Sequence, residues 1–271
     1  MDRTAVEPAP LEGVRLDRPR DGVALLTINR PERYNALDEP MLLGLAGLLD
    51  ALAGDPAVRS VVVCGAGPAF CAGGDLDVLR KVAGAPVEAG EDFLTRALQA
   101  AAALRRLPQP TIAALNGPVA GAGLGLALAC DIRIASPTAT LSAPSVSMGL
   151  VPEMGVTWLL PRLVGFGVAV ELLLSGRQVD ATEAQRLGVV TRICDDPVGS
   201  ALAMAAAFAA MPARAVAATK TLLQQALAGE LDAAIAAEAR EQAAAVHGPE
   251  FGDRYGARCT VSPADGQEDR P

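Results

Sequence analysis

The chain has 271 residues, of which 51% are hydrophobic and 20% are charged, and its formal net charge is −8. This length and apolar content allow one large domain, or one domain with an appendage, and exclude a disordered chain. Because no run of Lys or Arg offsets the acidic balance, the composition argues against nucleic-acid binding. A small polyanionic ligand is still compatible with the sequence, since it needs only a few local basic side chains such as Arg30 and Arg33.

Cysteine and histidine are too sparse for several common kinds of site. The five cysteines show no CxxC spacing, and His247 is the single histidine. These counts argue against a metal site and against a disulfide framework. One histidine near the C-terminus also argues against a Ser-His-Asp hydrolase.

Neither end of the sequence nor its apolar stretches predict export or membrane insertion. The N-terminus, MDRTAVEPAPLEG, has charges and prolines where a signal peptide has an apolar core, so we expect a cytoplasmic protein. Two uncharged stretches, 111–130 and 201–211, are predicted to be buried core. The first contains Asn116, Pro118 and several glycines, and the second is short and is followed by Pro212.

Strands and helices are predicted to alternate along the first half of the chain. The segment 23–29 predicts a buried strand, and Asp38 is an N-cap signal for a helix whose leucines recur at helical spacing until Asp55. Further strands are predicted at 61–63, from Thr111, at 132–135 and at 140–143, with a helix over 91–107. This alternation predicts an α/β core with partly parallel strands.

The second half of the chain is predicted to be mostly helical. Helices are expected over 157–164, 168–174, 181–187, 199–211, 213–227 and 231–246. We therefore expect a core over 13–195 and a helical layer over 196–258, whose Ala-rich faces suit packing against another subunit. Residues 1–12 and 260–271 are expected to be disordered.

Two glycine-rich turns each follow an apolar strand. They are CAGGD at Cys71–Asp75 and AGAG at Ala120–Gly123. Residues this small let backbone N–H groups approach a ligand, and the first N–H groups of a helix have no intrahelical partner. If both strands belong to one core, an N–H group from each turn could hold one carbonyl oxygen. The small residues are equally suited to close packing of a buried helix, and the turns alone leave both interpretations open.

Glu153 stands in a Pro/Met/Gly turn before an apolar helix. A carboxylate in apolar surroundings loses solvation, which raises its pKa and makes it a better proton acceptor near neutral pH. The alternative is that Glu153 only caps the following helix or interacts with its dipole.

Four ordered blocks resemble the enoyl-CoA hydratase/isomerase, or crotonase, superfamily. They are NRPERYNALD (29–38), the strand with GAGPAFCAGGDL (60–76), ALNGPVAGAGLGLALACDIRIAS (114–136) and GLVPEMGVTWLLPRLVG (149–165). The resemblance implies a crotonase-like α/β fold, a spiral of ββα units over 13–195 that carries the active site. It also implies a C-terminal helical trimerisation region over 196–258 and a homotrimer or dimer of trimers.

The resemblance also implies the site residues. The N–H groups of Gly74 and Ala122 match the oxyanion hole that holds the thioester oxygen and stabilises an enolate. An acyl-CoA thioester is the implied substrate, with no further cofactor and no metal. Substrate and CoA contacts are expected from residues in three of the blocks: Arg33, Ala36, Leu37, Ala72, Asp75, Leu76, Gly121 and Trp158.

Departures from the family pattern bear on the reaction. The two glutamates with which hydratases of this family position water correspond here to Gly125 and Ser145, which argues against hydration by that route. Glu153 instead matches the single acidic residue of one branch of enoyl-CoA isomerases. Our leading hypothesis is therefore an enoyl-CoA isomerase with Glu153 as acid and base. The alternatives are a hydratase that recruits another acid, and a catalytically silent acyl-CoA-binding homologue.

Overall fold

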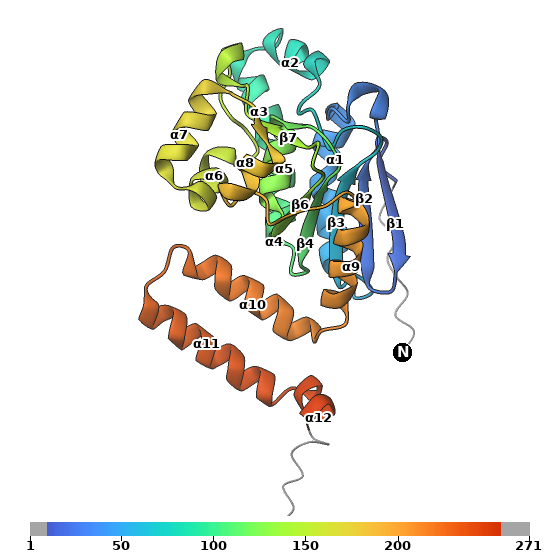
Figure 1. Ribbon diagram of the computed structural model, residues 1–271, viewed down its shortest axis with the longest axis vertical. Coiled ribbons are helices and arrows are strands. Elements are labelled where there is room, and N and C mark those ends of the chain that lie inside the picture. The colour runs from blue at the N-terminus through green and yellow to red at the C-terminus, as the bar shows by residue number, and fades with distance from the viewer. Residues whose placement is uncertain (1–9, 256–271) are drawn as a thin grey trace, which may run out of the picture. The chain divides into compact units, whose positions relative to one another are not determined.

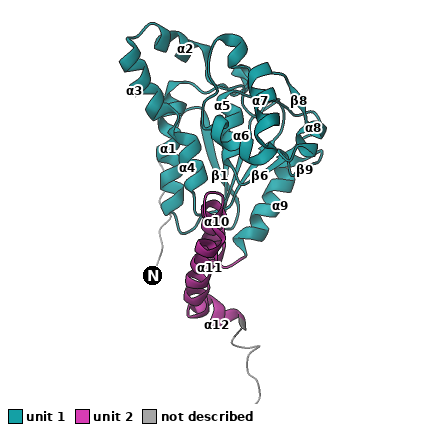
Figure 2. Ribbon diagram, turned by 90° about the vertical axis from the view of Figure 1, so that its left-hand side faces the viewer, with its two compact units in different colours: residues 1–210 teal, residues 211–271 magenta. Residues whose placement is uncertain are grey.

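The computed structural model describes residues 10–255 and divides the chain into two compact units, residues 1–210 and 211–271 (Figure 1, Figure 2). The terminal segments expected to be disordered, 1–12 and 260–271, lie outside the described residues apart from 10–12. The expected boundary at 195/196 falls within the first unit, because helix α9 (Pro197–Ala209) packs against the sheet of that unit.

A six-stranded sheet forms the centre of the first unit. Its strands, in spatial order, are β1 (Val14–Arg20), β2 (Val23–Ile28), β3 (Ser60–Gly65), β4 (Thr111–Leu115), β6 (Ile132–Ala135) and β9 (Arg192–Ile193). β1 runs antiparallel to β2, and all the other neighbours are parallel. β3 and β4 are fully buried, as parallel strands covered on both faces are. β1 is not predicted from the sequence, because this edge strand is mostly charged and only partly buried.

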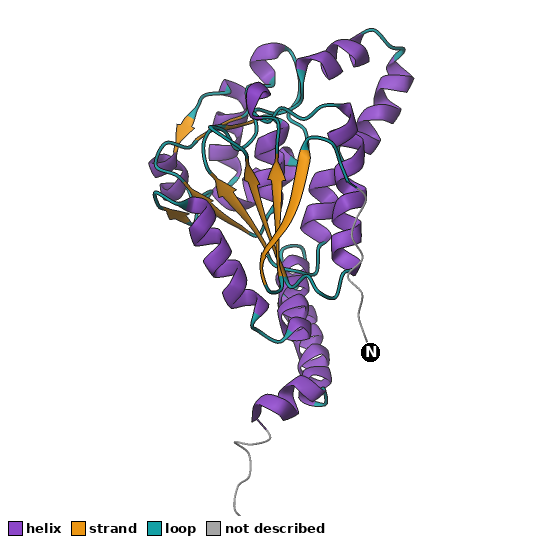
Figure 3. Ribbon diagram, turned by 90° about the vertical axis from the view of Figure 1, so that its right-hand side faces the viewer, coloured by secondary structure: helices purple, strands orange, loops and turns teal. Residues whose placement is uncertain are grey.

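Helices cover both faces of this sheet (Figure 3). The side chains of its strands contribute to two separate core clusters. Val61 and Val63 of β3 join the larger core cluster, together with α1 (Glu39–Gly54) and α4 (Gln99–Arg106). Val62 joins a second cluster that includes residues of α9. The side chains on each strand thus alternate between two apolar layers, which explains why the strands read as continuous apolar runs.

The rest of the first unit connects the sheet to the candidate site. It contains two short 3₁₀ helices and several α-helices, with a second sheet of three strands: η1 (Pro31–Arg33), α2 (Leu76–Ala83), α3 (Val87–Ala97), β5 (Val119–Ala120), α5 (Ala122–Ala129), β7 (Thr140–Ser142), η2 (Val146–Met148), α6 (Val156–Val164), α7 (Phe166–Ser175), β8 (Val179–Asp180) and α8 (Ala181–Arg186). The single helix predicted over 91–107 is wrong. It is divided into α3 and α4 at Leu98, where no Pro or Gly marks the break.

All eight residues of α5 are buried, and the helix packs against α4 and α6. Its small apolar side chains are therefore needed for close packing. Its first residue, Ala122, follows Gly121, whose φ of +49° belongs to the region that favours glycine. The glycine-rich turn thus supports dense packing, and it precedes the first N–H groups of the helix, which have no intrahelical partner.

The second unit consists of α10 (Ala213–Ala226), α11 (Leu231–Val246) and α12 (Pro249–Tyr255), in which α10 packs along α11. Large apolar side chains are exposed on α10, on α11 and between them: Leu223, Leu227, Leu231 and Ile235. Among the described residues, no single helix has the length and apolar content to cross a membrane. The consecutive helices α9 and α10 have the required length and apolar content only when they are counted together, and the chain bends by 111° between them.

Candidate active site

Backbone hydrogen bonds hold the two glycine-rich turns of the first unit against each other. The N–H of Ala120 donates to the carbonyl of Cys71 (2.9 Å), and the N–H of Cys71 donates to the carbonyl of Pro118 (3.3 Å). A Cβ atom at Gly73 would lie 3.1 Å from the carbonyl oxygen of Ala120 and 3.4 Å from the nitrogen of Ala122. Gly73 also has a φ of +106°. Glycine at this position lets the turns touch.

Gly74 and Ala122 each present a backbone N–H group from these adjoining turns. Leu37 flanks Gly74, because its N–H donates to the carbonyl of Gly73 (2.8 Å) and its carbonyl accepts from the N–H of Asp75 (2.9 Å). Within residues 10–255, neither the Gly74 nor the Ala122 N–H donates to another backbone or side-chain group. Both donors are therefore unused by the described part of the chain itself.

A cavity of about 550 Å³ opens beside these turns. Six of the predicted substrate-contacting residues line it, as do Gly74, Ser145 and Glu153: they are Arg33, Ala36, Ala72, Asp75, Leu76 and Gly121. The sequence does not predict several other lining residues, among them Tyr34, Met148 and Leu150. These lie at the ends of 3₁₀ helices or in loops, where hydrophobic periodicity gives no signal.

The Glu153 side chain faces the Gly74 side of this cavity. Its Oε1 lies 3.8 Å from the place that a Cβ atom on Gly74 would occupy. Within the described part of the chain, the carboxylate has no hydrogen-bond or salt-bridge partner, and burial raises its pKa. A half-buried carboxylate without a partner is poised to exchange a proton with a bound molecule, and it caps no helix here.

Asp75 and Arg33 form a charged part of the cavity wall. Asp75 accepts from the N–H of Asp77 (3.1 Å) and from Arg30 (3.2 Å), and these hydrogen bonds lower the pKa of its carboxyl group. Arg33 is about half exposed and pairs with Asp77 (3.0 Å). Asp75 thus caps the N-terminus of α2. The Arg33 guanidinium stays partly exposed and accessible to an anionic group of a ligand.

The structure does not place Leu37, Ala122 or Trp158 on the cavity wall: Ala122 is fully buried, and its neighbour Gly121 lines the cavity instead. Leu37 is fully buried and acts through its backbone, which holds the turn at Gly74. Trp158 lies on the exposed face of α6, with the Arg162 guanidinium 3.8 Å from its ring centroid and that of Arg105 at 4.9 Å. Leu159 and Leu160 occupy the buried face of α6, so Trp158 lies outside the core. Its observed interactions are these two cation–π contacts.

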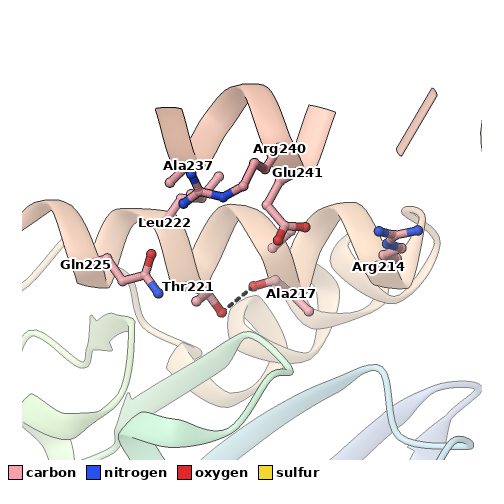
Figure 4. Close-up of a pocket in the computed structure, with 9 residues that line it drawn as sticks. Arg214, Ala217, Thr221, Leu222, Gln225, Ala237, Arg240 and Glu241 are labelled. Carbon is pink, nitrogen blue, oxygen red and sulfur yellow. Dashed lines mark hydrogen bonds between the residues drawn. The ribbon is translucent and has the colours of Figure 1, made fainter. Parts of the chain in front are cut away.

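A second cavity, of about 330 Å³, lies within the second unit between α10 and α11 (Figure 4). Arg240 and Glu241 of α11 line it opposite Gln225 and Thr221 of α10. The Thr221 hydroxyl donates to the carbonyl of Ala217 (2.9 Å) and is thus occupied within its own helix. This cavity has no glycine-rich turn, whereas the cavity of the first unit has two.

Within residues 10–255, no group of three or more His, Cys, Asp or Glu side chains is arranged to hold a metal ion. Separately from this finding, the cavity wall itself offers the free N–H group of Gly74 and the carboxylate of Glu153.

Comparisons with known proteins agree with this geometry. Residues 18–252 match the family model described as enoyl-CoA hydratase/isomerase. "Probable enoyl-CoA hydratase EchA14" of Mycobacterium tuberculosis H37Rv is 44% identical over 241 residues, which cover 87% of this chain and 93% of that protein. The Bacillus subtilis protein YngF is 39% identical over 219 residues, which cover 80% of this chain and 83% of that protein.

Solved structures share the fold along nearly the whole chain. A Streptomyces coelicolor A3(2) protein named as an enoyl-CoA hydratase superposes with a TM-score of 0.88 at 36% identity, covering 94% of each chain. A Thermobifida fusca YX protein, also named as an enoyl-CoA hydratase, was solved in complex with acetoacetyl-CoA. It has a TM-score of 0.78 at 37% identity and covers 86% of this chain and 94% of its own. The chain belongs to the enoyl-CoA hydratase/isomerase family and has the crotonase fold.

Proposed function

We propose that this protein is an acyl-CoA double-bond isomerase in which Glu153 moves a proton between C2 and C4 of an enoyl-CoA thioester. The observation that carries the proposal is the place of the Glu153 carboxylate, which has no hydrogen-bond or salt-bridge partner among residues 10–255 and faces the Gly74 side of the cavity. Binding of an acyl-CoA is supported by the structural neighbour solved with acetoacetyl-CoA.

The reaction needs only the groups that this cavity supplies. Glu153 takes a proton from C2 of a 3-enoyl thioester, and the electron pair of the broken C–H bond moves into a dienolate whose charge lies on the thioester oxygen. The N–H groups of Gly74 and Ala122 stabilise that oxygen. Protonated Glu153 then returns the proton to C4, which leaves the double bond between C2 and C3. No water is consumed in this sequence.

We assign the CoA portion to the wall that contains Arg33, Ala36, Ala72 and Leu76. The Arg33 guanidinium is suited to binding a phosphate group of CoA. Leu76, which is 54% exposed, offers apolar surface to the pantetheine chain of CoA. Leu37 contributes through its backbone, and we assign Trp158 no direct contact. We further propose a cytoplasmic homotrimer or dimer of trimers.

Hydration of a 2-enoyl-CoA is the second candidate, because EchA14 and the Streptomyces protein are named as hydratases. Addition of water by two carboxylates would require acidic residues at positions 125 and 145, which hold glycine and serine. A hydratase built on this cavity would have to orient water with Glu153 and the Ser145 hydroxyl, which both line it.

The test is a pair of assays on the protein and on Glu153→Gln. A 3-enoyl-CoA is followed as it becomes the conjugated 2-enoyl-CoA, and crotonyl-CoA is followed for loss of conjugation by hydration. We expect isomerisation in the first assay, and its loss in the variant with butyryl-CoA binding retained. Hydration without isomerisation would establish the second candidate. Butyryl-CoA binding with neither activity would identify a catalytically silent homologue.

A further inference from the structure

Gly125 lies in α5 one turn after Ala122 and contacts the loop that carries Glu153. A Cβ atom added at Gly125 would overlap the Cβ of Met154 and would lie 2.8 Å from its carbonyl oxygen. Non-bonded atoms do not approach so closely, and neither atom of Met154 is the end of a flexible side chain. Met154 thus packs directly against the backbone of α5 at Gly125, and this contact leaves no room for a side chain at position 125.

Met154 is held in an unusual conformation at this contact. Its φ is +53°, a value that residues other than glycine seldom adopt, and Gly155 follows with a φ of +74°. Met154 is also 1% exposed and belongs to the main core cluster. A strained residue keeps such a backbone only where its surroundings hold it, so the packing around Met154 determines the course of this loop.

Glu153 precedes Met154, and its direction follows from this arrangement. α5 begins at Ala122, whose N–H is one of the two proposed donors, and it packs against Met154 at Gly125. One buried helix therefore carries a donor for the thioester oxygen and also fixes the loop of the proton acceptor. The Glu153 carboxylate reaches the Gly74 side of the cavity from that loop.

We propose that Gly125 is a positioning residue, which seats Met154 and thereby directs the Glu153 carboxylate into the cavity. As a claim about catalysis this rests on the proposed function, in which Glu153 is the acid and base. It also explains why position 125 carries no carboxylate. Any side chain there would displace the main chain next to Glu153, so a glutamate at position 125 and Glu153 in its present place exclude each other.

The test compares Gly125→Ala with Gly47→Ala, a matched control in α1 where an added Cβ would have no neighbour within 4 Å. We expect Gly125→Ala to lower kcat for 3-enoyl-CoA isomerisation about 100-fold, as displacement of a catalytic group by about 1 Å does. The KM and the Kd for butyryl-CoA should change less than about twofold, because Arg33 and the Gly74 turn are untouched. Gly47→Ala should keep both kcat and KM.

A second measurement does not depend on turnover. The pKa of the Glu153 carboxyl group is followed by infrared spectroscopy, with the band assigned by its absence in Glu153→Gln. In Gly125→Ala the carboxyl group should leave its half-buried place, so its pKa should fall towards that of an exposed glutamate. If Gly125→Ala keeps both the kcat and the Glu153 pKa of the unchanged protein, Gly125 does not position Glu153.

Failure of the proposed function has a different signature, namely isomerisation that survives Glu153→Gln. The infrared comparison still decides the role of Gly125 in that case. If Gly125→Ala does not fold, Met154→Gly tests the same contact by removing the Met154 side chain that packs against Gly125. Glycine adopts a φ of +53° without strain, so this variant is compatible with the backbone at position 154. We expect a lower kcat and a lower Glu153 pKa at unchanged butyryl-CoA affinity. Wild-type values of both would overturn the inference.

Discussion

At the scale of single residues, the protonation of Glu153 determines the pH range in which the protein works. Burial raises its pKa, so the carboxyl group stays protonated to a higher pH than an ordinary glutamate with a pKa of about 4.3. Proton removal from C2 requires the ionised form. We therefore expect kcat/KM for isomerisation to fall as the pH decreases, with its midpoint above 4.3. Rate profiles between pH 4 and 8 measure this, with circular dichroism to confirm that the fold persists. A midpoint at or below 4.3 would contradict it.

The same burial predicts a cost to stability. At neutral pH Glu153 is ionised in the unfolded chain, whereas the fold disfavours its charge, so the free energy of unfolding is lower than it would be with a neutral side chain. Glu153→Gln should therefore unfold at a higher urea concentration at pH 7, and this gain should shrink as the pH falls through the raised pKa. Glu238→Gln, at an exposed position of α11, is the control and should show little change. A less stable Glu153→Gln would show that the charge is compensated in the fold.

The sequence predicts the site residues unevenly, and the reason lies in how far each depends on local pattern. Gly74 and Glu153, which line the cavity, stand in motifs that are recognisable by their small or apolar neighbouring residues. Ala122 stands in such a motif as well, but it is buried and does not line the cavity. Trp158 is an aromatic residue near a motif, but sequence proximity does not say which face of α6 it occupies. The seat of Met154 on Gly125 is a contact between α5 and a loop nearly 30 residues later, and no spacing rule predicts it.

At the scale of elements, buried apolar strands are predicted well and edge or very short strands are not. β2, β3 and β6 are apolar runs and are confirmed within about a residue or two at each end. β1 is not predicted because its charged side chains lie at the edge of the sheet and are mostly exposed. β8 and β9 are not predicted because a strand of two residues is too short to show an alternation of apolar and polar side chains. Helix α11 was predicted at its observed bounds, Leu231–Val246. Local pattern thus predicts the elements whose burial is regular.

The C-terminal end of α5 depends on one buried cation. Arg133 is 4% exposed and donates to the carbonyl oxygens of Cys130 (2.7 Å), Ala127 (3.3 Å) and Val189 (2.5 Å). Arg133→Met would remove three hydrogen bonds to buried carbonyl oxygens, so we expect a loss of about 3 kcal/mol in the free energy of unfolding. Urea denaturation measures this, with Arg192→Met at an exposed residue of β9 as the control. A loss below about 0.5 kcal/mol would mean that these carbonyls find other donors.

At the scale of the whole molecule, the two compact units divide the functions that we propose. The first unit holds every residue that lines the site cavity, including both turns and Glu153. The second unit exposes large apolar side chains on its own helices. Water-exposed leucines in such a group are costly to a monomer, since burying each one contributes roughly 1.5–3 kcal/mol. The second unit is therefore where we expect subunits to meet.

Assembly through α10 and α11 can be tested by placing charge on their exposed apolar residues. In the double variant Leu223→Glu/Ile235→Glu, two carboxylates would have to be buried without partners at any interface that covers these positions. We expect sedimentation equilibrium to give three or six times the chain mass for the unchanged protein and the monomer mass for this variant. Val87→Glu adds the same kind of charge at an exposed residue of α3 and should leave the oligomer intact. If the double variant kept the mass of the unchanged protein, the interface would have to lie elsewhere. The apolar residues of α10 and α11 would then be solvent-exposed in the assembly as well.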